Sequence, residues 1–101
     1  SLHELYGERS YDRYDLAVTS EVTERLMDRL ESEVPNSIGE LCVIGTDRID
    51  GFRYLLENNS WAAVRLSGTE PLVRVYAETE NRRSTELVIE DIVKSIEVQN
   101  V

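Results

Sequence analysis

The chain has 101 residues, of which 41% are hydrophobic and 31% charged, and its formal net charge is −9 at pH 7. A chain of this size forms one domain and buries enough surface for a modest core. The negative charge repels nucleic acids and anionic membranes, so neither is expected as a partner. No apolar run reaches the roughly 20 residues that a membrane-spanning helix needs.

The first ten residues, SLHELYGERS, are polar and charged and do not begin with methionine. They lack the apolar core of a secretory signal peptide, and we predict that the chain is a piece of a longer protein. Cys42 is the only cysteine, which rules out an intrachain disulfide. We predict that Cys42 is buried in a strand and that the protein is cytoplasmic.

The first half of the chain predicts a strand followed by a helix. Apolar and polar residues alternate over 14–18, which is typical of a strand. In 20–33 the residues Val22, Leu26 and Leu30 recur every four positions, which predicts an amphipathic helix.

The second half predicts a strand meander and a final helix. Strand-like runs occupy 41–47, 51–56, 61–66 and 72–79. Their connections are short, so successive strands are antiparallel, and Asn58 and Asn59 tolerate the positive φ of a tight turn. The helical period returns from residue 83 to 98, with an apolar stripe of Val88, Ile89, Ile92, Val93 and Ile96.

This order predicts an α+β fold, in which an antiparallel sheet of four to five strands is covered on one face by two helices. Side chains alternate between the two faces of a strand. Arg65 and Arg74 therefore share one face, and the small aliphatic residues of the same strands share the other. We predict that the aliphatic face lies under the helices and that both arginines project from the opposite face.

The loop between these two strands has the composition of an anion site. Arg65 and Arg74 flank the sequence Ser67-Gly68-Thr69-Glu70-Pro71. Hydroxyls, a glycine that lets backbone N–H groups approach a ligand, and two forked guanidinium groups suit a tetrahedral phosphate. Spacing alone leaves two interpretations open, a phosphate-binding loop or an ordinary connection with solvated arginines. Glu70 opposes an anion, so it turns outward, pairs with an arginine or accepts from ligand hydroxyls.

Two aromatic residues near this loop also have two interpretations. Trp61 and Tyr76 lie on the same strand faces as the arginines. They could flank a sugar, or they could fill space on the sheet face or meet a neighbouring domain. We favour the second interpretation.

The loop carries a family resemblance. VRLSGTEPLVRVYAE, at 64–78, resembles the C-terminal domain signature of the α-D-phosphohexomutases, the phosphoglucomutase/phosphomannomutase enzymes. The preceding DGFRYLL and the terminal helix fit the same domain, and ELYGERSYDRYDLAV, at 4–18, resembles the passage into it from the third domain. The resemblance implies that 1–9 is a residual segment of the preceding domain or linker. Residues 10–101 would form the C-terminal phosphate-binding domain, with a TATA-binding-protein-like fold.

The resemblance implies a role in an enzyme that interconverts hexose 1-phosphate and hexose 6-phosphate by intramolecular phosphoryl transfer. In this family the last domain grips the substrate phosphate that lies away from the reacting oxygen. Glu70 and Pro71 match the family loop, and the resemblance does not decide whether either touches the substrate. Carried over position by position, the implied phosphate contacts are Arg65, Ser67, Gly68, Thr69 and Arg74.

For the whole enzyme the resemblance implies Mg²⁺, a hexose 1,6-bisphosphate activator, a phosphosugar substrate and three other domains as partners. The chain lacks the family's phosphoserine and metal loops, because TDRIDG at 46–51 has the wrong aspartate spacing. We therefore expect no catalytic residue, metal site or cofactor here, and no activity from the isolated domain. Two alternatives stay open, namely the C-terminal domain of a phosphoglucosamine mutase and a standalone protein-interaction module.

Overall fold

The structure is a computed structural model, and it describes residues 9–49, 51–67 and 70–99. Six strands form one sheet in the order β1-β6-β5-β4-β3-β2, and every neighbouring pair is antiparallel. The elements follow one another as β1 (Ser10–Ala17), α2 (Ser20–Ser32), β2 (Ser37–Ile38), β3 (Leu41–Asp47), β4 (Phe52–Leu56), β5 (Ser60–Leu66), β6 (Leu72–Thr79) and α3 (Arg82–Gln99).

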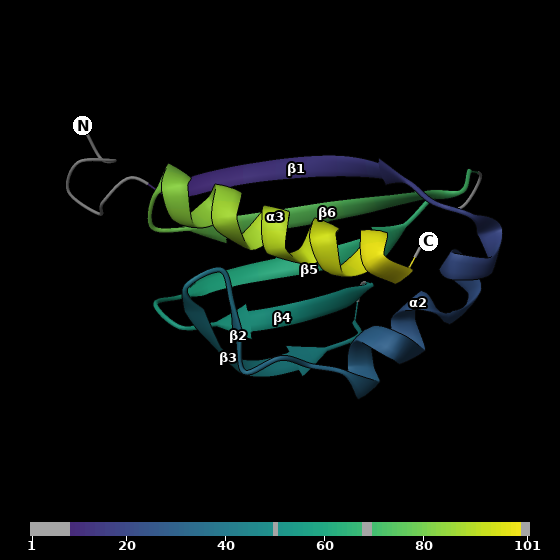
Figure 1. Ribbon diagram of the computed structural model, residues 1–101. Helices are drawn as coiled ribbons and strands as arrows, with labels where there is room; N and C mark the ends of the chain where they lie inside the picture. The colour runs from purple at the N-terminus through teal and green to yellow at the C-terminus, as the bar shows by residue number, and fades with distance from the viewer. Residues whose placement is uncertain (1–8, 50, 68–69, 100–101) are drawn as a thin grey trace.

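Both helices lie on one face of the sheet (Figure 1). Helix α3 packs along β1 and β6, and α2 packs against β4 near the other edge. This arrangement confirms the predicted α+β class, and the implied TATA-binding-protein-like fold is consistent with it. Neither helix in the described part of the chain is long and apolar enough to cross a membrane.

The sheet differs from the predicted one of four to five strands in two ways: β1 is longer than predicted, and β2 is a sixth strand. β1 begins at Ser10 instead of residue 14, because all eight of its residues pair with β6 from Thr79 back to Leu72. β2 has only two residues, paired with the start of β3, which is too short to leave a periodic pattern in the sequence. Backbone pairing with an existing strand therefore orders segments whose side chains carry little strand signal.

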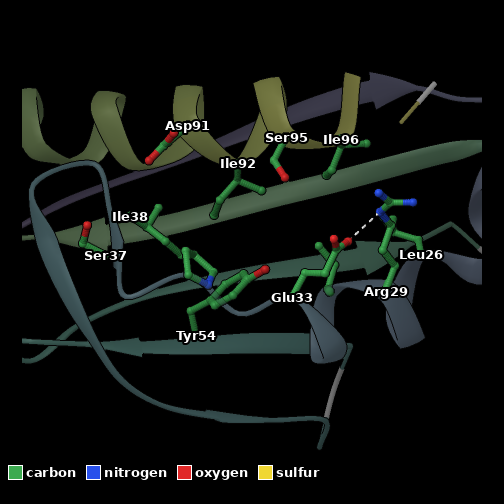
Figure 2. Close-up of a pocket in the computed structure, with 12 residues that line it drawn as sticks. Leu26, Arg29, Glu33, Ser37, Ile38, Tyr54, Asp91, Ile92, Ser95 and Ile96 are labelled. Atoms are coloured by element: carbon green, nitrogen blue, oxygen red, sulfur yellow. Dashed lines mark ion pairs between the residues drawn. The ribbon is translucent and has the colours of Figure 1, made fainter. Parts of the chain in front are cut away.

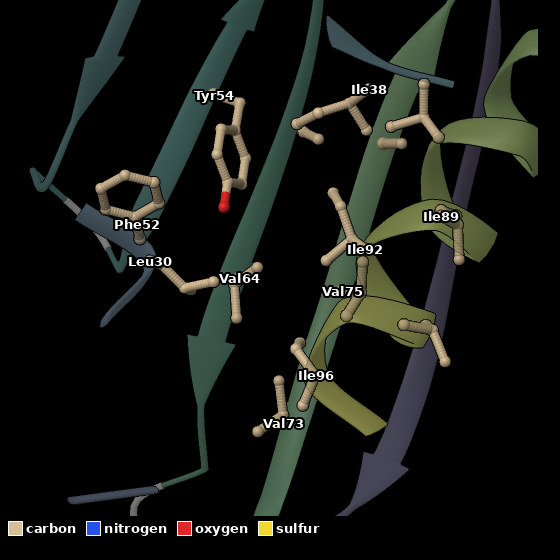
Figure 3. Packing of buried hydrophobic residues seen from close by; sticks show 14 of the residues in the cluster. Leu30, Ile38, Phe52, Tyr54, Val64, Val73, Val75, Ile89, Ile92 and Ile96 are labelled. Carbon is tan, nitrogen blue, oxygen red and sulfur yellow. The ribbon is translucent and has the colours of Figure 1, made fainter. Parts of the chain in front are cut away.

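The core lies between the sheet and the two helices (Figure 3). Val64, Val73 and Val75 are 0% exposed, so the aliphatic faces of β5 and β6 lie under the helices as predicted. Helix α2 contributes Leu26 and Leu30 to the same cluster. The predicted stripe of α3 is buried in full, as Val88, Ile89, Ile92, Val93 and Ile96.

The β4–β5 turn has the backbone that its sequence predicts. Asn58 and Asn59 have φ values of 60° and 56°, and they are the two central residues of a tight turn in which the Ser60 amide donates to the Glu57 carbonyl at 3.2 Å. The guanidinium group of Arg9 donates to the carbonyl oxygens of both asparagines, at 3.3 and 2.5 Å. The predicted boundary after residue 9 falls beside this contact, and residues 1–8 lie outside the described part of the chain.

Candidate functional site

The loop between β5 and β6 is closed by its own backbone. The amide of Ser67 donates to the carbonyl of Leu72 at 2.9 Å, and the amide of Leu72 donates to the carbonyl of Glu70 at 2.7 Å. The Glu70 amide lies 3.3 Å from the Ser67 hydroxyl oxygen, its acceptor. These three hydrogen bonds fix the two ends of the loop, at Ser67 and at Glu70–Leu72.

The loop is also anchored to the neighbouring connection. The amide of Val18 donates to the carbonyl of Pro71 at 2.9 Å, which joins the loop to the segment between β1 and α2. Ser67 is half-buried, whereas Glu70 and Pro71 are exposed. The other two predicted contacts, Gly68 and Thr69, lie outside the described residues.

Arg65 and Arg74 lie directly opposite each other in the β5–β6 ladder. Both are exposed and project from the face that the helices leave uncovered, as the side-chain alternation predicts. Like charges at opposed positions repel, so the pair destabilises the sheet unless a negative group lies nearby. Strand register therefore brings two of the five predicted contacts together at the base of the loop.

Asp15 provides negative charge beside this pair, and the sequence alone did not single it out. It pairs with Arg74 in the β1–β6 register, and its Oδ1 lies 3.9 Å from the Arg74 Nε and 3.5 Å from the Arg13 Nε. All three side chains are largely solvated, so each ion pair adds little to stability. Only the register between β1 and β6 could have revealed Asp15, because no motif contains it.

A glycine lets the β3–β4 turn approach the same arginines. Gly51 has a φ of 77°, and a Cβ built there would lie 2.6 Å from the Val64 carbonyl oxygen and 2.9 Å from the Arg65 Cγ. Real Cβ atoms do not approach other heavy atoms so closely. Gly51 therefore allows this turn to pack against the backbone and the side-chain stem of Arg65.

The uncovered face continues from Arg65 into a shallow hollow of about 280 Å³. The ring of Tyr11 lies 6.1 Å from that of Trp61 and 6.4 Å from that of Tyr76, between centroids. Trp61 and Tyr76 thus pack on the sheet face, and Tyr11 joins them because β1 starts earlier than predicted. The hollow is lined by Tyr11, Asp47, Ile49, Arg53, Trp61, Ala63, Arg65 and Tyr76.

Arg53 is a third arginine on this face, and it has a partner of its own. Its Nε and Nη2 both donate to Asp47 Oδ2, at 3.0 and 2.6 Å. The hydrogen bond from Arg53 holds the pKa of the Asp47 carboxyl below its ordinary value of 3.8. Because Arg53 is committed to this carboxylate, it offers an internal comparison for the two arginines at the loop.

We expect a carbon NMR titration to find the Asp47 pKa below 3.8, and Arg53→Ala to return it to the ordinary value. A carboxyl with a lower pKa in the folded than in the unfolded state stabilises the fold above its unfolded pKa. That contribution disappears as the pH falls through the folded pKa, so the pair matters only above the acid range. An Asp47 pKa at or above 3.8 in the wild-type chain would contradict the pairing.

Two other predictions concern chemistry elsewhere in the chain. Cys42 is exposed, not buried as predicted, because it alternates along β3 with Leu41 and Val43, which pack against the core, and so lies on the opposite face of the strand. A hydrogen bond with Glu57 raises the pKa of its thiol, which keeps it protonated. In the described part of the chain no three His, Cys, Asp or Glu side chains cluster as a metal site requires.

A family model described as phosphoglucomutase/phosphomannomutase, C-terminal domain, matches residues 18–95, which is most of the chain. The chain belongs to this family. The matched range contains the β5–β6 loop, both flanking arginines, helix α2 and most of helix α3. The family resemblance that the loop sequence carries is thereby confirmed.

Relatives of this phosphohexomutase-family domain are mutases by name. A phosphopentomutase of Thermococcus kodakarensis is 41% identical over 66 residues, which cover 63% of this chain and 14% of that protein. A probable phosphoglucosamine mutase of Methanothermobacter thermautotrophicus is 35% identical over 65 residues, 64% of this chain and 14% of that protein. A probable phosphoglucosamine mutase of Methanobrevibacter smithii is 29% identical over 84 residues. The chain therefore spans less than a fifth of the length of these relatives.

Proposed function

We propose that this domain holds the phosphate of a phosphosugar for a mutase that moves a phosphoryl group between two positions of the sugar. The observation that carries the proposal is the register of Arg65 opposite Arg74 at the base of the loop. Two guanidinium groups at opposed positions repel each other, and a dianion between them converts that repulsion into attraction. The Ser67 hydroxyl would supply a further donor, as the family resemblance implies.

The proposed site binds phosphate weakly by itself. Hydrogen bonds with a charged partner are worth on the order of 1.5–3 kcal/mol each. Three or four of them, less the entropy lost on association, leave a dissociation constant of roughly millimolar for free phosphate. Weak binding suits a site that must release its ligand in each turnover.

In the longer enzyme this grip would act at a distance from the reacting oxygen. Binding energy from a remote phosphate can be used to orient the substrate, which raises kcat/KM without chemistry at the phosphate itself. We further propose that the domain closes over the cleft as a unit and so excludes water from the transferred group. The proposed mutase forms a bisphosphate intermediate that rebinds in the opposite orientation. The same two arginines would therefore bind the phosphate at either end of the sugar.

The cofactors that the resemblance implies belong to this proposal only for the longer protein. Mg²⁺ would supply charge stabilisation for phosphoryl transfer there. Among the described residues no cluster suits a metal, so we assign the ion to no residue of this chain and expect the isolated domain to be inactive. The cytoplasmic location predicted from the sequence is also part of the proposal.

We propose a phosphosugar substrate and assign no particular sugar. The relatives named above include a phosphopentomutase and two probable phosphoglucosamine mutases, which supports a sugar phosphate mutase and favours no single sugar. A phosphoglucosamine mutase therefore stands beside the phosphoglucomutase/phosphomannomutase assignment. Assays of the longer protein on glucose, mannose, glucosamine and pentose phosphates would separate them.

The direct test is a titration of the 101-residue chain with inorganic phosphate, followed by amide NMR. Millimolar phosphate should shift the amide signals of residues 67–70 more than those of other loops. Arg74→Ala should abolish these shifts, whereas Arg53→Ala should preserve them because Arg53 is paired with Asp47. Shifts of equal size throughout the chain, or shifts reproduced by sodium chloride at the same ionic strength, would reject the site.

A further inference from the structure

A row of charged side chains crosses three neighbouring strands on the uncovered face of the sheet. Asp15 of β1 lies opposite Arg74 of β6, and Arg74 lies opposite Arg65 of β5. Directly opposed residues on one face of an antiparallel sheet have Cβ atoms about 4.5–5.5 Å apart, so each member of the row lies beside the next. Arg74 therefore has a carboxylate on one side and a second arginine on the other.

Asp15 is shared between two arginines. Its Oδ1 lies 3.5 Å from Arg13 Nε and 3.9 Å from Arg74 Nε. Arg13 lies two residues before Asp15 on β1, so both side chains lie on the same face of the strand. A carboxylate carries one negative charge and cannot neutralise two guanidinium groups. Arg74 therefore keeps part of its attraction for an anion.

The contact between Asp15 and Arg74 is too long to be a hydrogen bond. N–H···O hydrogen bonds in proteins are typically about 2.7–3.2 Å long. The ion pair of Arg29 with Glu33, at the hollow between the two helices, has this length, at 2.9 Å (Figure 2). The side chains of Arg74 and Asp15 are 44% and 40% exposed, so water competes for both groups. A phosphate that makes shorter, charge-assisted hydrogen bonds with Arg74 can displace such a contact.

We propose that Asp15 is an internal counter-ion of Arg74, which the substrate phosphate displaces when it binds. Without ligand, Asp15 attracts the Arg74 guanidinium group and offsets its repulsion by Arg65. When phosphate binds, Arg74 turns to the ligand and Arg13 remains beside Asp15 to balance its charge. This inference rests on the proposed function of the loop and adds a residue that regulates its affinity.

The direction of the effect follows from charge. The Asp15 carboxylate repels a phosphate dianion, and its attraction for Arg74 must be overcome before the ligand is held. Asp15 therefore weakens phosphate binding and speeds release. A positioning residue that held Arg74 ready for the ligand would have the opposite effect, but positioning requires a directional hydrogen bond, which a 3.9 Å contact does not supply.

The test is a titration of inorganic phosphate into the 101-residue chain, followed by the amide signals of residues 67–70. Asp15→Asn should bind phosphate about threefold to tenfold more tightly than the wild-type chain, the size expected for one charge beside a dianion at a solvated site. Asp15→Ala should show a similar gain, because both changes remove the charge. Raising potassium chloride from about 20 to about 300 mM should reduce the gain, because salt screens exposed charges.

The matched control is Asp12→Asn, the same chemical change on the same strand. Asp12 lies on the other face of β1, where it lines a hollow beside α3. It accepts the Arg13 amide N–H at 2.8 Å, and an asparagine oxygen can accept the same bond. Asp12 and Asp15 are both exposed, so both variants should fold. Asp12→Asn should change phosphate affinity by less than about twofold, because the lost charge lies farther from the ligand.

Steady-state kinetics of the longer mutase gives a second readout. Asp15→Asn should lower KM for the phosphosugar severalfold without raising kcat, because the variant strengthens binding of the ground state and slows release. A structural defect would instead lower kcat/KM, so the two explanations move this ratio in opposite directions.

Three results would overturn the proposal. One is unchanged or weaker phosphate binding in either Asp15 variant, and another is equal tightening by Asp12→Asn and Asp15→Asn. The third is a raised KM in Asp15→Asn of the longer enzyme. Failure of the proposed function is distinguishable, because phosphate shifts would then be absent from the wild-type chain itself, and this inference would fail with it.

Discussion

Replacing Arg74 with alanine is expected to lower kcat/KM of the longer mutase by roughly tenfold or more. The change removes a charge-assisted hydrogen bond to the substrate phosphate, worth on the order of 1.5–3 kcal/mol, and about 1.4 kcal/mol corresponds to a factor of ten in rate. Arg74→Lys should recover only part of the loss, because an ammonium group keeps the charge but not the two-pronged donor geometry. Steady-state kinetics on the phosphosugar substrate measures both effects.

The matched control for this experiment is Arg53→Ala. Arg53 lies on the same face of the same sheet, but its donors are committed to Asp47. Among the described residues, the ion pair that Arg74 makes is a long, solvated contact with Asp15, so both variants should fold normally. Normal kinetics for Arg74→Ala, or equal losses for Arg74→Ala and Arg53→Ala, would remove Arg74 from the site.

Replacing Gly51 with alanine is expected to lower the free energy of unfolding by about 2–4 kcal/mol. Part of this loss comes from holding a residue with a Cβ at positive φ, and part from forcing that Cβ against a packed backbone. The nearest atom is the Val64 carbonyl oxygen, at 2.6 Å, which belongs to a fully buried residue of β5 and cannot easily move. Urea denaturation of the 101-residue chain measures the difference.

Gly45→Ala is the control, because it makes the same chemical change in β3. A Cβ at Gly45 would meet Leu55 Cδ1 at 3.5 Å, an ordinary contact, and its φ lies outside the range that strains an L-residue. We therefore expect its unfolding free energy to stay within about 1 kcal/mol of wild type. Equal stability of the two variants would show that the β3–β4 turn does not pack against β5 as described.

The Gly51 variant also bears on the candidate site. Its added Cβ would lie 2.9 Å from the Arg65 Cγ, so the side chain of Arg65 must move to make room. Phosphate shifts at residues 67–70 should therefore weaken in Gly51→Ala and persist in Gly45→Ala. This comparison links the loss of stability to the loop through the close approach of Gly51 to Arg65.

Local sequence patterns predicted the parts of this domain that depend on period and composition. A two-residue period placed Arg65 and Arg74 on one face of the sheet and Val64, Val73 and Val75 on the other, and the buried residues agree. These patterns predict the two faces correctly because side chains alternate along a strand, so the position of a residue fixes the face on which it lies. The loop sequence likewise indicated the family, which the match over 18–95 confirms.

The patterns were weaker where pairing or edge position overrides composition. β1 begins at Ser10 because all eight of its residues pair with residues of β6, although the first residues of β1 are polar. Cys42 is exposed because its side chain lies on the face of β3 opposite Leu41 and Val43, the residues that pack against the core. Apolar composition predicts burial only when something covers the face on which the residue lies.

By itself the sequence determined the order of strands and helices, the face on which each strand residue lies, and the family to which the chain belongs. Only the tertiary structure decided that Asp15 lies beside Arg74 and that Gly51 packs against Arg65. The physical reason is the separation in sequence between the residues that interact. Faces follow from neighbouring residues along the chain, whereas register and packing arise between segments far apart in sequence and are selected by the fold as a whole.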